Sequence, residues 1–308
     1  MRLLISKIAT FAQNFELNFL VFILAYPLIL FVAYLPFSLF YALSDFMFFI
    51  TYHVLGYRKK ITRKNLTLAF PNFTQSKIKS VEKAFYKHMC DLFLEMIKSI
   101  GISKKEMLKR FKINNLEILH RLEEQQKSTI LTCGHYGNWE WLLSVSYHTH
   151  LKGFAIYKPV TNPYFDRLVK RIRKRHKAFL ISKRHAVETI KQHAKDGILG
   201  LYGFASDQTP RPRKKTYWRK FMGITVPVFA GSELLAKELD LAVVFARINR
   251  VKRGYYEADL ELLTDVPKRT KKNEITDTFF EWLEEQIHKD PTQYLWSHDR
   301  FKHTKKDS

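Results

Sequence analysis

A histidine and a glutamate stand five positions apart, directly after a short apolar run. The run extends from Ser128 to Cys133, and the next seven residues are Gly134-His135-Tyr136-Gly137-Asn138-Trp139-Glu140. A neutral imidazole with one nitrogen held by a carboxylate has a fixed tautomer, so its other nitrogen can take a proton. His135 and Glu140 are therefore candidates for a general base and the carboxylate that orients it.

The spacing of this pair also predicts its local geometry. Five positions along a regular helix would place the two side chains roughly 140° apart. We therefore expect His135 in a turn, which Gly134 and Gly137 allow to bend tightly, and Glu140 on the helix that follows. A chain with 12 histidines and 29 acidic residues contains about one such pair by chance. The alternative is a structural histidine that caps the following helix.

A second polar pair, Asp207-Gln208, follows the apolar run Ile198 to Phe204. Sites in parallel sheets form at the carboxyl ends of strands, so this pair is expected in the same crevice as His135. The alternative is an ordinary turn in which the aspartate bonds its own backbone.

Apolar β-rich runs alternate with helical patterns through the rest of the chain. This alternation predicts an α/β fold, a mainly parallel sheet with flanking helices on both faces. Strands are expected at Thr129–Cys133, Phe154–Tyr157, Ile198–Phe204, Leu241–Ile248 and Tyr255–Leu263. Helices are expected at Pro163–Arg175, His185–Lys195 and Gly231–Leu239.

The N-terminal segment predicts a membrane anchor. No charged residue occurs from Leu17 to Ser44, which exceeds the roughly 20 residues that span a bilayer. Because Pro27 and Pro36 interrupt it, we expect one membrane helix, either kinked or followed by a partly immersed segment. A cleaved signal peptide is not expected, because the run is too long. The basic stretch 58–64 predicts a cytoplasmic catalytic domain at 58–308, after an anchor at 1–57.

The formal net charge of +23 predicts anionic partners: nucleic acid, anionic lipid or an acidic protein. Basic residues crowd the stretches 167–177 and 211–220. Membrane binding explains both the apolar segment and the charge, whereas nucleic-acid binding explains only the charge, so no nucleic acid is expected. Cys90 and Cys133 have no metal-site spacing and form no disulfide framework, which fits a reducing compartment.

Taken together, several short motifs resemble the lipid A biosynthesis acyltransferases, the late lauroyl/myristoyl transferase family. They occur in the family's order across almost the whole chain. The matching motifs are Asn65-Leu66, Phe70-Pro71, His135-x4-Glu140, Tyr157-x-Pro159, Asn162-Pro163-x2-Asp166, Arg173-x-Arg175, Asp207-Gln208, Phe221-x-Gly223, Val226-Pro227-x-Phe229, Arg247 and Trp296-x-His298-x-Arg300-x-Lys302.

The resemblance implies a glycerolipid-acyltransferase-like domain with a single N-terminal membrane helix, on the cytoplasmic face of the inner membrane. It also implies an acyl-carrier-protein thioester as donor and an anionic glycolipid, a lipid A precursor, as acceptor. The carrier protein is acidic, so the positive charge of the chain has a second natural partner.

The resemblance also implies roles for particular residues. His135 would be the general base and Glu140 its orienting carboxylate, with direct attack of the acceptor hydroxyl, so neither a metal, a cofactor nor an acyl-enzyme is required. Arg173 or Arg175 would stabilise the oxyanion. Asp207 and Gln208 would stand at the crevice wall, and Arg247, Arg300 and Lys302 would bind phosphate or support the fold.

Two other functions remain open from the sequence. The same chemistry would acylate another membrane acceptor, such as a lysophospholipid, an aminolipid or a glycolipid. A non-enzymatic, basic, membrane-anchored binding protein would carry a structural histidine instead. The stretch Arg211 to Lys220 is more basic than the family leads one to expect, and Met222 stands where an aromatic residue is common. Acceptor identity and acyl chain length are therefore not predicted.

Overall fold

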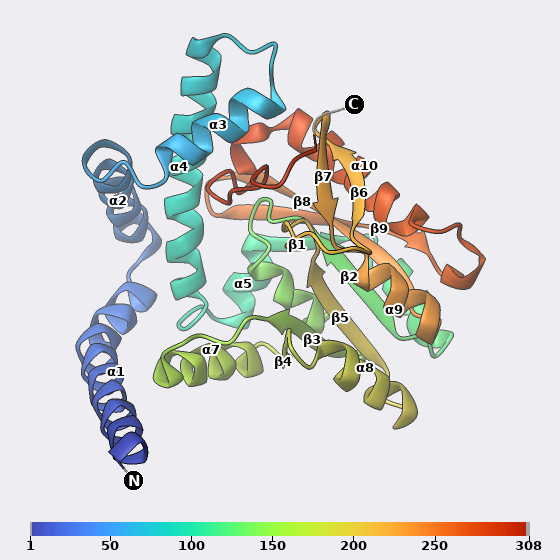
Figure 1. Cartoon of the computed structure of the whole chain (residues 1–308), viewed down its shortest axis with the longest axis horizontal. Helices are drawn as coiled ribbons and strands as arrows, with labels where there is room; N and C mark the ends of the chain where they lie inside the picture. Colours follow the sequence, from blue (N-terminus) through green and yellow to red (C-terminus); the bar gives the residue numbers. More distant parts are fainter. Residues whose placement is uncertain (1, 306–308) are drawn as a thin grey trace.

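A seven-stranded sheet forms the centre of the molecule (Figure 1). The computed structural model describes residues 2–305, with side chains from residue 16 onward. In spatial order the strands are β1 (Phe111–Asn114), β9 (Tyr255–Thr264), β8 (Ala242–Lys252), β2 (Thr129–Cys133), β5 (Gly200–Ala205), β3 (Lys152–Tyr157) and β4 (Ala178–Ser182). Neighbours are parallel except β8 and β9, which pair antiparallel.

Helices cover both faces of this sheet, so the predicted α/β fold class is confirmed. The segments α8, α9 and α10 pack on one face, and α5, α6 and the 3₁₀ helix η2 pack on the other. The helices are α1 (Arg2–Tyr34), α2 (Phe37–Phe48), the π-helical η1 (Phe49–Val54), α3 (Lys59–Ala69), α4 (Gln75–Lys98), α5 (Lys104–Arg110), α6 (Glu117–Glu124), η2 (Trp141–Tyr147), α7 (Pro163–Arg175), α8 (Ala186–Lys195), α9 (Gly231–Leu239), η3 (Pro267–Arg269), α10 (Glu274–Lys289) and η4 (Pro291–Gln293).

The predicted elements are all present, and β2, α7 and α9 begin and end where the sequence pattern places them. The prediction missed the short edge strands β1 and β4 and the hairpin of β6 (Tyr217–Phe221) and β7 (Ile224–Val228). One expectation was wrong: a 3₁₀ helix, not a regular α-helix, follows the His135 turn. Glu140 lies immediately before that 3₁₀ helix rather than on it.

Local sequence explains how α7 starts beside the sheet. Asn162 caps the helix, because its side-chain oxygen accepts from the backbone N–H of Tyr164 at 2.9 Å, and Pro163 occupies the first turn. Asp166 in the same turn complements the helix dipole. The result is a well-fixed helix whose residues can face the site from the carboxyl end of β3.

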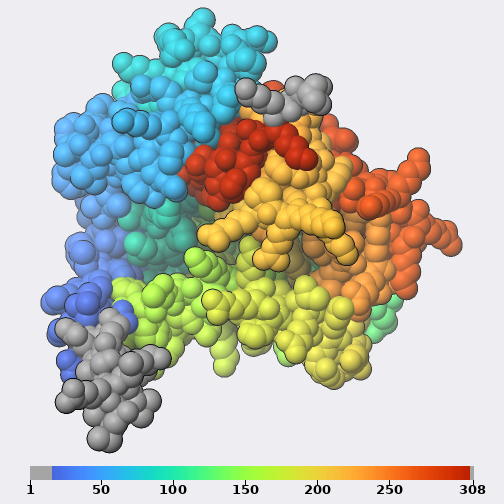
Figure 2. All heavy atoms as spheres, viewed as in Figure 1, coloured from blue at the N-terminus to red at the C-terminus, as the bar shows by residue number. Residues whose placement is uncertain are grey.

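Two helical segments are long and apolar enough to cross a membrane, Glu16–Tyr34 and Phe37–Val54. Both pack partly on the folded domain: Ser44 of α2 donates to Asp91 of α4 at 2.6 Å, and the ring of Phe22 in α1 lies 5.2 Å from that of Phe165 in α7. In the space-filling view the blue of α1 meets the yellow-green of α7 (Figure 2). The boundary at residue 57 stays a prediction.

Candidate active site

The turn after β2 brings His135 against Asp207 at the end of the neighbouring strand β5. Oδ1 of Asp207 lies 2.5 Å from Nδ1 of His135 and also accepts the backbone N–H of His135 at 3.2 Å. Since β2 and β5 are parallel neighbours, their carboxyl ends meet at one edge, as expected. The predicted proximity of Asp207 to His135 is confirmed, and the contact is direct.

The structure assigns Glu140 a different contact from the predicted one. Its carboxylate is paired with the guanidinium of Arg173 in α7, and Nη1 of Arg173 also donates to the backbone carbonyl of Glu140 at 3.3 Å. The expectation that Glu140 holds the imidazole was therefore wrong, because Asp207 occupies Nδ1. Glu140 acts on His135 only through space, as one of the negative charges that raise the pKa of the ring.

The charges around His135 suit a general base. Burial favours the neutral imidazole, but the charge and hydrogen bond of Asp207 outweigh it and raise the pKa of His135 above 6.5. Burial likewise opposes ionisation of Asp207, yet His135 and Arg300 lower the pKa of this carboxyl below its usual range. Asp207 is therefore ionised and can stabilise the imidazolium that forms when His135 takes a proton.

Gln208, the next residue, reaches the other ring nitrogen. With Nδ1 donating to Asp207, Nε2 of His135 is an acceptor, and the side-chain N–H of Gln208 donates to it at 3.2 Å. The ring of Trp139 stands edge-on to the imidazole at 5.1 Å between centroids. A substrate hydroxyl that approaches Nε2 must therefore displace the Gln208 amide.

An apolar cavity of about 280 Å³ opens beside His135. Its floor consists of small residues that alternate along two paired strands, Gly153 and Ala155 of β3 and Gly203 and Ala205 of β5. Because successive strand residues point to opposite faces, all four lie on the side covered by η2. The cavity runs along β3 from Tyr157 to Gly153, about 13 Å at the usual rise per residue.

Cys133 also lines this cavity but is not a candidate nucleophile. Burial, together with the charge of Asp207, raises the pKa of its thiol far above the ordinary range. A cysteine attacks as its thiolate, so a thiol held neutral is inert.

The C-terminal segment packs against the turn that carries His135. The backbone N–H of Leu295 donates to the carbonyl of His135 at 3.0 Å, and Tyr136 and Tyr294 form an isolated β-bridge. Arg300 is fully buried beneath Phe221, with its charge acting on Asp207, and donates to Thr209 at 3.1 Å. Arg300 therefore cannot reach a lipid phosphate on the surface, and its place supports the predicted alternative, a role in the fold.

Helix α4 holds the same turn through two hydrogen bonds, which the sequence pattern did not predict. His88 bonds the carbonyl of Gly137 at 3.2 Å, and Glu95, seven residues later on the same helix face, accepts from the amide of Asn138 at 2.7 Å. The signal available in the sequence was a set of titratable residues, His88, Asp91 and Glu95, at helical spacing among the apolar positions of an amphipathic helix.

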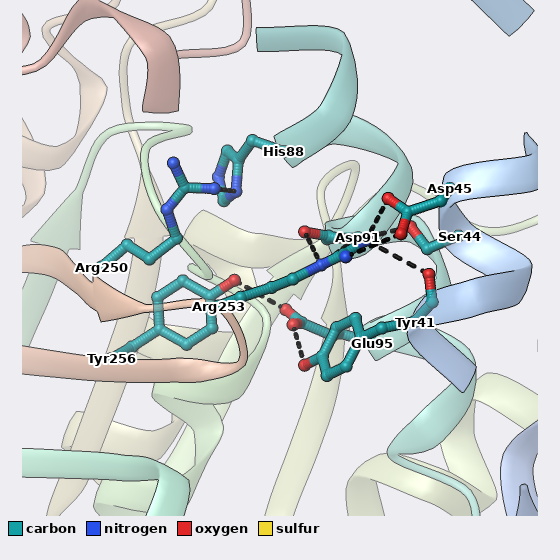
Figure 3. Close-up of polar contacts among 9 residues, drawn as sticks. All are labelled: Tyr41, Ser44, Asp45, His88, Asp91, Glu95, Arg250, Arg253 and Tyr256. Carbon is teal, nitrogen blue, oxygen red and sulfur yellow. Dashed lines mark hydrogen bonds and ion pairs between the residues drawn. The ribbon is translucent and has the colours of Figure 1, made fainter. Parts of the chain in front are cut away.

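Glu95 also connects the turn to the N-terminal helix α2. Its carboxylate accepts from the hydroxyls of Tyr41 in α2 and Tyr256 in β9, both at 2.8 Å (Figure 3). Arg253 at the β8–β9 turn bridges Asp45 of α2 and Asp91 of α4. Burial, with the nearby Asp91 charge, raises the pKa of Glu95 to about 7.

Three of the predicted basic residues do not line the cavity beside His135. Arg175 donates to the carbonyl of Ile100 on the surface, so only Arg173 of the two arginines lines the cavity. Arg247 pairs with Glu261 and donates to the carbonyl of Trp282 at 3.1 Å, which ties β8 to β9 and α10. Lys302 is exposed.

Comparison with known proteins decides the family. Residues 11–303 match the family described as bacterial lipid A biosynthesis acyltransferase. The chain belongs to this family. It is 26% identical over 256 residues to the lipid A biosynthesis acyltransferase of Haemophilus influenzae, covering 80% of this chain and 78% of the relative. It is 23% identical over 279 residues to the lipid A biosynthesis lauroyltransferase of Escherichia coli, covering 88% of each.

Membership of the lipid A acyltransferase family confirms the resemblance seen in the motifs and makes the chain an acyltransferase associated with the membrane. The structure shows what several of the family motifs contribute to the fold. Asn65 of α3, for example, donates to the carbonyls of Trp296 and His298 at 2.9 and 2.7 Å and so fixes the C-terminal segment.

Proposed function

We propose that this protein moves a fatty acyl chain from an acyl-carrier-protein thioester to a hydroxyl of a lipid A precursor, at the cytoplasmic face of the inner membrane. The observation that carries the proposal is the His135–Asp207 pair at the mouth of an apolar cavity. A base and a dry space for a hydrocarbon chain are the two components that acyl transfer to a lipid requires.

The proposed reaction proceeds by direct attack. Nε2 of His135 takes the proton of the acceptor hydroxyl while the oxygen forms a bond to the thioester carbonyl carbon. The tetrahedral intermediate then expels the thiolate, and the imidazolium returns the proton to sulfur. An ester replaces a thioester, and no acyl-enzyme, metal or cofactor takes part.

Arg173 is the proposed donor to the oxyanion. Its guanidinium lines the cavity and is held there by Glu140, so Glu140 acts by orienting Arg173 rather than His135. A pre-positioned cation in a largely buried site stabilises developing negative charge with little reorganisation.

The donor protein is proposed to dock at a basic groove of about 930 Å³, which we define by Arg211, Arg213, Lys214, Lys215 and Lys272. Among the residues that the structure describes, the first four are exposed and form no ion pair with a carboxylate. The groove begins at Pro210, two residues after Gln208, so an acidic carrier bound there would present its thioester near His135.

The exposed apolar faces of α1 and α2 are proposed to hold the protein in the bilayer, with α1 as the single crossing. Since α1 also contacts the folded domain at Phe22 and at the buried Val32, only its exposed face would meet lipid. Acylation of a different membrane acceptor would use the same base and cavity, so only the product separates the two functions.

The deciding experiment is mass spectrometry of lipid A from cells that lack this protein, complemented with wild type or His135→Ala. The proposal expects one acyl chain to be lost, restored by wild type and not by the variant. If lipid A is unchanged in the deletion strain and another lipid lacks an acyl chain, that lipid is the acceptor instead. Full activity of His135→Ala would overturn the mechanism.

Donor choice can be tested with purified enzyme in vesicles. We expect carrier-protein thioesters to be used in preference to coenzyme A thioesters, and added salt to weaken that preference because it screens the basic groove. Equal use of both donors at low salt would contradict the docking.

A further inference from the structure

A second apolar cavity lies between the anchor and the catalytic domain. Its volume is about 310 Å³, and its walls come from α1, the last turns of α4 and the apolar stripe of α7. We call it the membrane-side cavity and define it by Ile29, Phe93, Met96, Leu168, Val169 and Ile172. Side chains of this kind favour an apolar occupant over water.

The inner wall of the membrane-side cavity is also a wall of the cavity beside His135. Glu140, Leu143 and Arg173 line both spaces. The Glu140–Arg173 ion pair therefore separates the two cavities, and an occupant of the outer one lies a single ion pair away from the acyl cavity.

The outer wall belongs to segments that meet lipid. Ile29 is part of the apolar stretch of α1, which is mostly exposed. Helix α7 turns Leu168 and Val169 toward the cavity, whereas Arg167 and Lys170 are exposed. An apolar stripe with a basic opposite face is typical of a helix at the membrane interface, where its cations meet phosphate headgroups.

We infer that the membrane-side cavity binds an acyl chain that the lipid acceptor already carries. The inference rests on the proposed function, because it takes the acceptor to be an acylated membrane lipid. A lipid whose chain lies between α1 and α7 has its polar part beside the shared wall, close to His135. The Glu140–Arg173 pair keeps the resident chain of the acceptor apart from the incoming chain of the donor.

Filling the cavity tests this assignment by kinetics. In vesicles, Val169→Trp is expected to raise the KM for an acylated lipid A precursor at least tenfold. The KM for the donor thioester, and the KM for the same precursor with its chains removed, should not change. Glu188→Trp, at an exposed position of α8 that lines neither cavity, is the control and should behave as wild type. An equal effect of Val169→Trp on both acceptors, or no effect on either, overturns the inference.

A binding measurement on the wild-type protein keeps the test independent of folding and of turnover. A lipid A precursor with a photoreactive group on one acyl chain is expected to label peptides 93–97 and 168–173, and unlabelled precursor should suppress this labelling. Equal labelling by a photoreactive phospholipid that the precursor does not displace would assign the cavity to bulk lipid and overturn the inference. Specific labelling without acyl transfer would instead contradict the proposed function alone.

Discussion

One carboxylate oxygen of Asp207 fixes both the ring and the backbone of His135, with Oδ1 2.5 Å from Nδ1 and 3.2 Å from the backbone nitrogen. The oxygen that orients the imidazole is thus the same one that accepts from the backbone of the turn. Asp207 therefore sets the tautomer and the position of the base together, and Glu140 is left to hold Arg173.

Because Asp207 contacts His135 and Glu140 contacts Arg173, substitutions of the two carboxylates should affect the kinetics differently. Asp207→Asn should lower kcat by about 10²–10⁴-fold, because the amide no longer enforces the productive tautomer or stabilises the imidazolium. Glu140→Gln should lower kcat through Arg173 and move the acidic limb of the pH–rate profile to lower pH by less than Asp207→Asn, because Glu140 contributes less than Asp207 to the raised pKa of His135. Steady-state kinetics with both variants checks this. Wild-type kcat in Asp207→Asn would refute the role of Asp207.

The raised pKa of His135 predicts the acidic limb of the pH–rate profile. A protonated imidazole cannot accept the hydroxyl proton, so kcat/KM should fall as pH drops through a value above 6.5. Asp207→Asn removes the charge that raises this pKa, so the residual activity should have its limb at lower pH. The profiles of the two proteins are to be compared at constant ionic strength. A limb that does not move would show that another group titrates.

Glu95 predicts a pH-dependent stability. Its pKa rises from 4.5 to about 7 on folding, so the folded state binds the proton more tightly. The stability this provides is present below pH 4.5 and is lost as pH rises through about 7. Glu95→Gln, which cannot titrate, should flatten the fall in free energy of unfolding over this window, as measured by urea unfolding in detergent.

Glu188→Gln is the control for the Glu95 variant, since its side chain is 86% exposed. It should leave the slope of stability against pH as in wild type. Identical slopes in wild type and Glu95→Gln would mean that Glu95 does not titrate in this range.

The small residues beneath η2 predict the length of the transferred chain. Ala155→Leu places a larger side chain on the floor of the cavity, so the preferred donor should carry a shorter acyl chain, and kcat with the native donor should fall. Competition between donors of different length, with products identified by mass spectrometry, measures this. Ile190→Leu in α8, which is buried on the opposite face of the sheet and does not line the cavity, should keep the wild-type preference.

Much of the fold follows from local patterns. The end of β2 was predictable because its apolar run stops at Gly134. The start of α7 was predictable because Asn162-Pro163 is a typical helix-capping pair. The antiparallel pairing of β8 and β9 was not predicted, although Glu257, Asp259 and Glu261 alternate with apolar residues and a two-residue connection, Arg253-Gly254, joins the strands, and both features are typical of a hairpin.

The residues of the site were predicted, but not all of the contacts between them. His135, Asp207 and Gln208 meet because their strands are neighbours, which the strand-end rule anticipates. Whether Asp207 or Glu140 would hold Nδ1 depended on a 3₁₀ helix in place of an α-helix and on Arg173 arriving from α7. Neither is encoded in the spacing of the motif itself.

The bond from Leu295 to the carbonyl of His135, with the adjacent Tyr136–Tyr294 bridge, has a consequence for biosynthesis. The apolar α1 and α2 precede this segment in the chain, so they leave the ribosome before it. Both apolar helices are therefore made before the site can close, and a chain cut short before residue 290 would carry them without the contacts that hold His135 in place.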